Sequence, residues 1–400
     1  MADLGADEPA ELSTVRTCPL QPPPEYGRLR AEQPISKVAM PNGTSAWLIT
    51  RYDDARAMLA DPRFSADSRK PGFPLMIGHP QPVRRWARTM LTMDGAEHAA
   101  ARRAVISEFT VKRVQALQPR IQQIVDRCVD RMLAEKRPVD VVTVLSLPVP
   151  SLVICELLGV PYDDHDYFQS RARSLLNRNT PPKEIATARD ELHDYLGTVV
   201  ADKMEHPGDD LISRQIAQRA HGEVDQESLI SLARLLLNAG HETTANMISL
   251  GTLGLLLNPD QLAAIRDDPT NTPLAVEELL RYFSIINGPS RIATEDVDLG
   301  GVRIRAGEGV IAPTLAANHD NAVFADPDHL AIERGARQHV AFGYGPHQCL
   351  GQNLARAELQ SVFDTLFRRI PHLRLTIPVE KLPFKHDAFI YGLHELPVTW

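Results

Sequence analysis

The longest helical pattern in the sequence covers residues 228–257 and limits most strongly what the chain can fold into. About 30 residues at a rise of about 1.5 Å each make a helix of roughly 45 Å, long enough to cross a whole domain. Asp225 can cap its start, and Asn258 followed by Pro259 ends it. Its most apolar part, 247–257, is broken by Gly and Ser and is shorter than the roughly 20 residues that a membrane span needs. We therefore expect one domain-crossing helix and no membrane anchor.

The other segments indicate one mixed domain that is mainly α with a smaller β-rich part. Further helical patterns lie at 97–168, 183–206 and 274–283. Strand-like pieces lie at 44–50, 297–311 and 373–400. Because no repeat, low-complexity block or linker divides the chain, we expect a single domain over residues 21–400. Residues 1–20, which are acidic and contain proline, are expected to form a flexible N-terminal arm.

Charge, cysteine content and the N-terminus exclude several classes of protein. The formal net charge of −8 at pH 7 argues against nucleic acid as a partner, since a phosphate-binding surface normally has a basic excess. The four cysteines are scattered, at positions 18, 128, 155 and 349, and show no spacing typical of a disulfide framework or a zinc site. The N-terminus lacks the basic and then apolar order of a secretory signal. We expect a cytoplasmic monomer.

The segment FGYGPHQCLG, residues 342–351, places three glycines around Cys349, and a helical pattern follows it. Glycines allow backbone conformations that bring N–H groups toward a sulfur, and a helix N-terminus stabilises negative charge, so the position suits a thiolate. Two other interpretations remain at this point. The segment can be a turn that carries a buried, inert cysteine, or Cys349 can be a nucleophile with His347 as its base.

Five spaced positions of this segment match the haem-binding loop of the cytochrome P450 family, which the chain resembles over roughly residues 20–400: Phe342, Gly345, His347, Cys349 and Gly351. The resemblance implies a triangular, mainly α domain that encloses a b-type haem. The haem would lie between this loop and the long helix, with Cys349 as the metal ligand. Phe342 and Gly351 would then belong to the cofactor site.

The segment AGHETT, residues 239–244, puts a polar cluster in the middle of the long apolar helix, where it would ordinarily destabilise burial. One interpretation is a solvated kink. The segment is also similar to the oxygen-activation motif of the P450 family. That likeness implies that Glu242 and Thr243 lie over the distal face of the haem as catalytic groups that guide protons, and that Gly240 makes room for dioxygen.

Two further groups of charged residues match the family. His98 and Arg102 project from one helix face, where they can meet an anionic ligand or simply face water. The resemblance implies that both hold the haem propionates together with Arg291 and His347.

Glu278 and Arg281 are an i, i+3 pair, which alone would be a weak surface contact. In the family the matching residues form a buried structural network with a further arginine, whose place Arg334 fits here. A basic strip of Arg103, Lys112, Arg113 and Arg356 is also expected, on which an acidic ferredoxin could dock.

The Pro-rich and Gly-rich loop at 70–82 carries apolar side chains, as loops that cover a pocket often do. From the family's matching segments we expect a large apolar substrate pocket lined by Phe73, Leu75, Met76, Ile77, Ala239, Ile285 and Ile390. His79 lies in the same loop and could reach the iron when no substrate is bound.

The resemblance implies a monooxygenase that inserts one atom of O2 into a C–H or C=C bond of a bulky apolar small molecule. Electrons from NAD(P)H would arrive through a ferredoxin and its reductase. The C-terminal segment FKHDAFIYGLHELPVTW resembles actinomycete members that modify macrolides and other secondary metabolites or oxidise xenobiotics. Two alternatives are a peroxide-driven peroxygenase and a haem-based ligand sensor. The intact Glu242–Thr243 pair counts against the first, and the lack of a visible output domain against the second.

Overall fold

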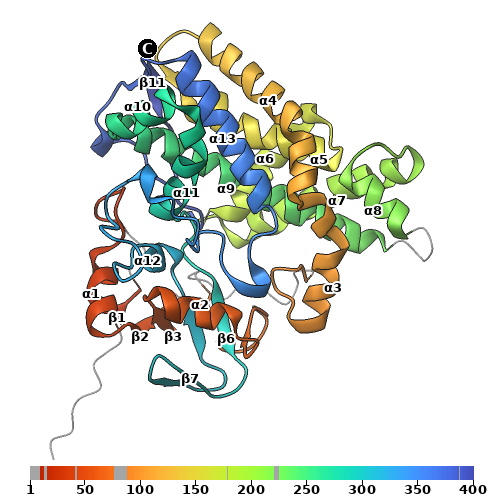
Figure 1. Ribbon diagram of the computed structural model, residues 1–400. Helices are drawn as coiled ribbons and strands as arrows, with labels where there is room; N and C mark the ends of the chain where they lie inside the picture. Colours follow the sequence, from red (N-terminus) through yellow and green to blue (C-terminus); the bar gives the residue numbers. More distant parts are fainter. Residues whose placement is uncertain are drawn as a thin grey trace, which may run out of the picture.

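The computed structural model describes residues 10–12, 16–40, 43–75, 88–177, 179–219, 225–386 and 388–400. Figure 1 shows a large helical part above a smaller β-rich part, as the sequence predicts. The principal helices of the large part are α3 (Gly95–Val105), α4 (Val111–Ala134), α5 (Pro148–Leu158), α6 (His165–Leu176), α7 (Pro182–Glu205), α8 (Leu211–Arg219), α9 (Gln226–Leu257), α10 (Pro259–Asp267), α11 (Thr272–Phe283) and α13 (Gln352–Arg369).

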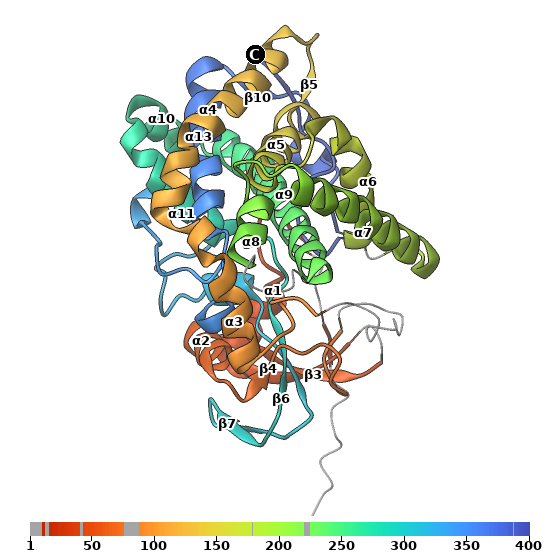
Figure 2. The same ribbon diagram turned by 90° about the vertical axis from the view of Figure 1, so that its right-hand side faces the viewer.

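The 32-residue helix α9 is the predicted domain-crossing helix, and it begins two residues earlier than the sequence pattern indicated. Figure 2 shows it in the middle of the helical part, where it packs against α5, α7, α11 and α13. Gly251 permits close packing on one side, since a Cβ there would lie 2.4 Å from the Cζ atom of Phe363. No helix in the described ranges is both long enough and apolar enough to cross a membrane.

The β-rich part is a six-stranded sheet in the order β1-β2-β3-β9-β6-β4. Its strands are β1 (Ala10–Glu11), β2 (Ile35–Ala39), β3 (Ser45–Ile49), β4 (Phe64–Ser65), β6 (Ser290–Ala293) and β9 (Gly309–Ile311). The accompanying helices are α1 (Pro24–Glu32), α2 (Tyr52–Ala60) and α12 (Thr314–Asn318). Segments far apart in the sequence meet here, because β3 pairs in parallel with β9. This pairing brings the chain after α11 back beside the N-terminal strands.

Two small sheets complete the fold. The hairpin of β7 (Val297–Leu299) and β8 (Val302–Ile304) turns through Gly300 and Gly301, whose φ angles of +54° and +82° favour glycine. The other sheet has the order β10-β11-β5 and joins β10 (Arg374–Leu375) and β11 (Pro397–Thr399) to β5 (Val139–Asp140). The strand-like pieces predicted at 297–311 and 373–400 therefore belong to separate sheets.

The last part of the expected flexible arm is held against the helical part. Arg16 is only 4% exposed, and its Nη2 donates to the carbonyl of Phe283 at 3.0 Å, where α11 ends. Its guanidinium lies 3.8 Å from the ring centroid of Tyr391, whose hydroxyl donates to the carbonyl of Pro19. The last carbonyls of a helix lack partners within the helix, so Arg16 satisfies one of them. The packed domain therefore begins before residue 21.

Candidate active site

A cavity of about 430 Å³ lies between the Cys349 segment and the middle of α9, with further walls from α3, α5 and the chain after α11. The site residues predicted from the sequence that line it are His98, Arg102, Ala239, Gly240, Thr243, Ile285, Arg291, Phe342, His347, Cys349 and Gly351. Its remaining walls are mainly apolar and include Leu236, Met247 and Leu280. The cavity thus combines a large apolar surface with a few polar groups, as small-molecule sites usually do.

The backbone of the Cys349 segment turns tightly at two glycines. Gly343 and Gly345 both have φ near +71°, and a Cβ on Gly345 would lie 2.6 Å from the carbonyl oxygen of Leu59. The N–H of Cys349 donates to the carbonyl of Phe342 at 2.8 Å, which closes the loop just before α13. The glycines are therefore required by local geometry, and the loop presents the cysteine at the cavity wall.

The thiol of Cys349 is exposed to the cavity, whereas Cys128 and Cys155 are buried. Desolvation raises the pKa of Cys128 to about 11 and that of Cys155 to about 12, so both are inert. Desolvation also raises the pKa of Cys349, against the N–H groups of Gly351 and Gln352 and the charges of two arginines. A bound metal cation would supply the stabilisation that the thiolate still needs.

The geometry disfavours Cys349 as a nucleophile activated by His347. Among the described residues no hydrogen bond joins the two side chains; the ring of His347 instead stacks on His98, with centroids 4.0 Å apart. Burial, together with the charge of Arg291, lowers the pKa of His347 to about 4. His347, stacked on His98, is therefore not placed to take a proton from the Cys349 thiol.

The cationic edge of the cavity fits the carboxylates of a haem. Arg291 is 7% exposed and donates to the carbonyl of Ser290, and burial lowers its pKa and that of Arg102. In the described part of the chain neither arginine forms an ion pair with a carboxylate. Glu358 also lines the cavity, but burial raises its pKa well above the usual range and favours the neutral form. Two cations that lack counter-ions, beside an apolar chamber, match a planar apolar group with two acidic side chains.

The polar cluster of α9 is divided between the cavity and the helix packing. Thr243 lines the cavity, and its hydroxyl donates to the carbonyl of Ala239 at 2.6 Å. Gly240 also lines it, and a Cβ there would lie 3.2 Å from Cδ1 of Ile154, another lining residue. The α9 helix continues without interruption through this cluster, and His241, Glu242 and Thr244 are buried, so the cluster is not solvated.

Glu242 was expected beside Thr243 over the haem, but it is not among the described residues that line the cavity. It is 5% exposed, and its carboxylate lies 3.4 Å from Nζ of Lys385 and 3.3 Å from Nδ2 of Asn246. Burial would raise its pKa, but the charge of Lys385 and further cations outweigh burial and lower it. Consecutive residues of a helix point about 100° apart, which explains why Glu242 and Thr243 face different surroundings.

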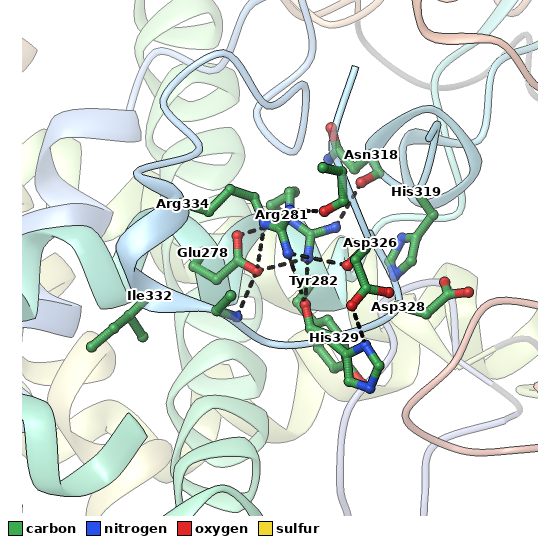
Figure 3. A network of polar contacts seen from close by, with 12 residues as sticks. Glu278, Arg281, Tyr282, Asn318, His319, Asp326, Asp328, His329, Ile332 and Arg334 are labelled. Atoms are coloured by element: carbon green, nitrogen blue, oxygen red, sulfur yellow. Dashed lines mark hydrogen bonds and ion pairs between the residues drawn. The ribbon is translucent and has the colours of Figure 1, made fainter. Parts of the chain in front are cut away.

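Glu278, Arg281 and Arg334 meet in a buried network, which Figure 3 shows from close by. The side chains of Glu278 and Arg281 are 0% exposed, and two hydrogen bonds of 2.7 and 2.8 Å join them. Nε of Arg334 lies 3.2 Å from the same carboxylate. Arg281 also donates to the carbonyl of Asn318 at 2.8 Å. The network ties α11 to the chain that enters the Cys349 segment.

Several expected pocket residues lie elsewhere. Phe73, Leu75 and Ile390 are not among the described lining residues, and Met76, Ile77 and His79 lie outside the described residues. The segment before Leu75 packs on the sheet instead, because a Cβ on Gly309 would lie 2.8 Å from Pro74. Ile390 forms a β-bridge with Ile286, which itself lines the cavity.

Lining residues that sequence reasoning missed include Met90, Phe109, Ile154, Leu235, Leu236, Met247 and Leu280. The spacing of 235, 239, 243 and 247 on one face of α9 was the available signal.

The fold and the site define a helical protein that presents one cysteine to an apolar chamber with a cationic edge. The family model for cytochrome P450 matches residues 175–387. Cytochrome P450-SU2 of Streptomyces griseolus is 50% identical over 384 residues, which cover 96% of this chain and 94% of that protein.

Two solved structures agree over almost the whole chain. Cytochrome P450 MoxA from Nonomuraea recticatena is 60% identical, with a TM-score of 0.92 and 98% of each chain covered. The mycinamicin VIII C21 methyl hydroxylase MycCI from Micromonospora griseorubida, bound to mycinamicin VIII, is 41% identical, with a TM-score of 0.93 and coverage of 98% of this chain and 100% of that one. The chain belongs to the cytochrome P450 family and is a monooxygenase of actinomycete type that uses haem b and O2.

The buried network generates a prediction about stability. Glu278→Gln keeps the shape of the side chain but leaves the charge of Arg281 buried without its partner. We expect the free energy of unfolding to fall by about 3–5 kcal/mol, as measured by urea denaturation of the haem-loaded protein. The exposed pair of Arg303 and Asp298 provides the control, since Asp298→Asn should change little. Equal effects of the two substitutions would contradict the role of the network.

Proposed function

We propose that the protein hydroxylates or epoxidises a bulky apolar small molecule, such as a macrolide or another polyketide-like secondary metabolite. The observation that carries the proposal is the mainly apolar cavity whose wall holds both the Cys349 thiol and the Thr243 hydroxyl: the haem would occupy the side next to Cys349 and the substrate the side next to Thr243. The MycCI structure, which is bound to mycinamicin VIII, supports a ligand of this kind. Relatives named for a reaction, including pentalenic acid synthase, support turnover rather than ligand sensing.

Each group at the cavity wall takes a defined part in this function. Cys349 would ligate the haem iron, and Arg102, Arg291, His98 and His347 would hold the two propionates. When bound, the haem supplies the activation of O2, and its thiolate ligand favours cleavage of the O–O bond. The rest of the protein binds the substrate, excludes water and moves protons.

Proton movement would involve Thr243, Glu242 and Lys385. The Thr243 hydroxyl now donates to Ala239, and it must exchange that bond in order to donate to a ligand in the cavity. Glu242 is held away from the cavity by Lys385 and Asn246, and Lys385 is 14% exposed. When Glu242 leaves Lys385, its carboxylate would take up a proton from the surface side and, turned toward Thr243, donate that proton into the cavity.

Electrons would come from NAD(P)H through a ferredoxin and its reductase, in the cytoplasm. The described cysteines are all free, which supports a reducing compartment. The expected docking strip is smaller than the sequence suggested. Arg113 pairs with Glu108 and Asp209, and Arg356 pairs with Glu277, which leaves Arg103 and Lys112 as exposed cations of that strip.

Replacing Cys349 tests the proposed iron ligand. Cys349→Ala should abolish the thiolate Soret band of the reduced, CO-bound protein, because no other described cysteine lines the cavity. Cys155→Ala, which changes a buried thiol, is the matched control and should keep the band. A band of unchanged position in Cys349→Ala would show that another group ligates the iron.

Replacing Thr243 tests proton delivery. Proton transfer by a positioned group is worth about 10²–10⁴-fold in rate, so in Thr243→Ala the ratio of product to consumed NAD(P)H should fall by about tenfold or more. The lost electrons should appear as hydrogen peroxide, while haem and substrate binding stay intact. Thr243→Ser keeps the hydroxyl and should remain largely coupled. Product, peroxide and NAD(P)H are measured together, and full coupling in Thr243→Ala would mean that protons arrive by another route.

A further inference from the structure

The carboxylate of Glu277 on α11 is buried beside the Cys349 segment and binds two side chains. It is 6% exposed, and it accepts hydrogen bonds from Nε and Nη2 of Arg356 at 2.6 and 3.0 Å. Nε2 of His339 lies 3.2 Å from the same carboxylate. Burial alone would raise the pKa of Glu277, but the contacts with His339 and Arg356 hold it at about 2. Glu277 is therefore a permanent negative charge between α11, α13 and the chain before the cysteine.

Arg356 uses its whole guanidinium in this arrangement. Besides the two bonds to Glu277, Nη1 donates to Oε1 of Gln352 at 3.0 Å, one turn earlier on α13. The centre of the guanidinium lies 4.6 Å from the ring centroid of Phe342. A planar fork held by a carboxylate and stacked on an aromatic ring has a fixed position, which a lysine would not reproduce. Its side chain is only 22% exposed, so little of it is available for contact with another protein.

His339 ties the same carboxylate to the start of the cysteine loop. The N–H of Ala341 donates to Nδ1 of His339 at 3.1 Å, which leaves Nε2, 3.2 Å from the Glu277 carboxylate, to carry the ring proton. The side chain of His339 is 1% exposed, and its ring lies 5.8 Å from that of Phe342. The chain from 339 to 342 is thus fixed by contacts on both sides of Phe342.

Phe342 connects this cluster to the sulfur. Its carbonyl accepts the N–H of Cys349 at 2.8 Å, while Arg356 lies on its ring. The ring of Phe342 thus holds the Arg356 guanidinium, while its carbonyl holds the backbone of the iron-ligand candidate Cys349. A fixed positive charge near a thiolate reduces the electron density that the sulfur can donate.

We propose that Glu277, His339 and Arg356 are positioning residues that hold one positive charge beside Cys349 and so set the reduction potential of the haem iron. The proposal rests on the function proposed above, with Cys349 as the iron ligand. It replaces the expectation that Arg356 is part of a docking strip for ferredoxin. On this account Arg356 acts on the iron through the sulfur of Cys349. Changes to the protein surface around Arg356 should therefore leave the reduction potential unchanged.

The test is a redox titration of haem-loaded variants. Arg356→Met keeps an unbranched side chain on Phe342 but removes the charge that favours the more negative, reduced state. We expect the equilibrium to shift toward the oxidised iron by about tenfold, which corresponds to about 59 mV for one electron. Glu277→Gln removes the buried negative charge with little change of shape and should shift the potential in the opposite direction. Arg356→Lys restores the charge without the fork and should recover part of the shift.

Arg369→Met is the matched control, because Arg369 lies at the far end of the same helix and pairs with Asp130. The reduction potential of the Arg369→Met variant should equal that of the wild type. The proposal is overturned if Arg356→Met and Glu277→Gln both keep the wild-type potential, and a raised KM for ferredoxin in Arg356→Met would then make Arg356 a docking residue. Should Arg356→Met fail to fold, the sign of the shift in Glu277→Gln decides. Failure of the proposed function would look different, since the wild-type protein itself would then lack the thiolate Soret band.

Discussion

The ion pair of Glu278 and Arg281 is the interaction on which the position of the active site depends. Both side chains are fully buried, so each charge has lost its hydration and is stabilised only by its partners. Those partners come from different places: Asn318 is the last residue of α12, and Arg334 precedes the cysteine segment. A loop has few backbone hydrogen bonds of its own, and its placement comes from such contacts. The network in Figure 3 therefore fixes the side of the cavity from which Cys349 projects.

The opposite wall of the cavity is set by a different constraint, the burial of α9. Its apolar positions pack mainly on α5, α7, α11 and α13, which leaves Thr243 facing the chamber while Glu242 finds a separate partner in Lys385. Haem supplies the difficult chemistry in this family, and the chain supplies the distances, the dry walls and the proton donors. On the cysteine side, the ion pair of Glu277 and Arg356 lies on the ring of Phe342, the residue that begins the cysteine segment.

The sequence predicted those features that local patterns encode. Periodicity located α9 to within two residues at its start, and the spaced glycines indicated a tight loop at Cys349. Features that depend on long-range pairing were not predicted: Lys385 lies 143 positions from Glu242, and Arg16 lies 267 positions from Phe283. The expected places of Phe73 and Glu242 differed because sheet packing and helix rotation, respectively, decided where these side chains face.

Ligand binding to the haem-loaded protein tests most directly whether this cavity is a chamber for a bulky apolar substrate. The measurement is the ligand-induced shift of the Soret band, titrated with macrolides, polyenes, steroids, small aromatics and small polar compounds. The account predicts saturable shifts with macrolide-sized apolar ligands. It also predicts that Ala239→Phe, which fills part of the cavity wall, weakens these shifts more than those of small aromatics. Tight binding of small polar ligands alone, unaffected by Ala239→Phe, would contradict it.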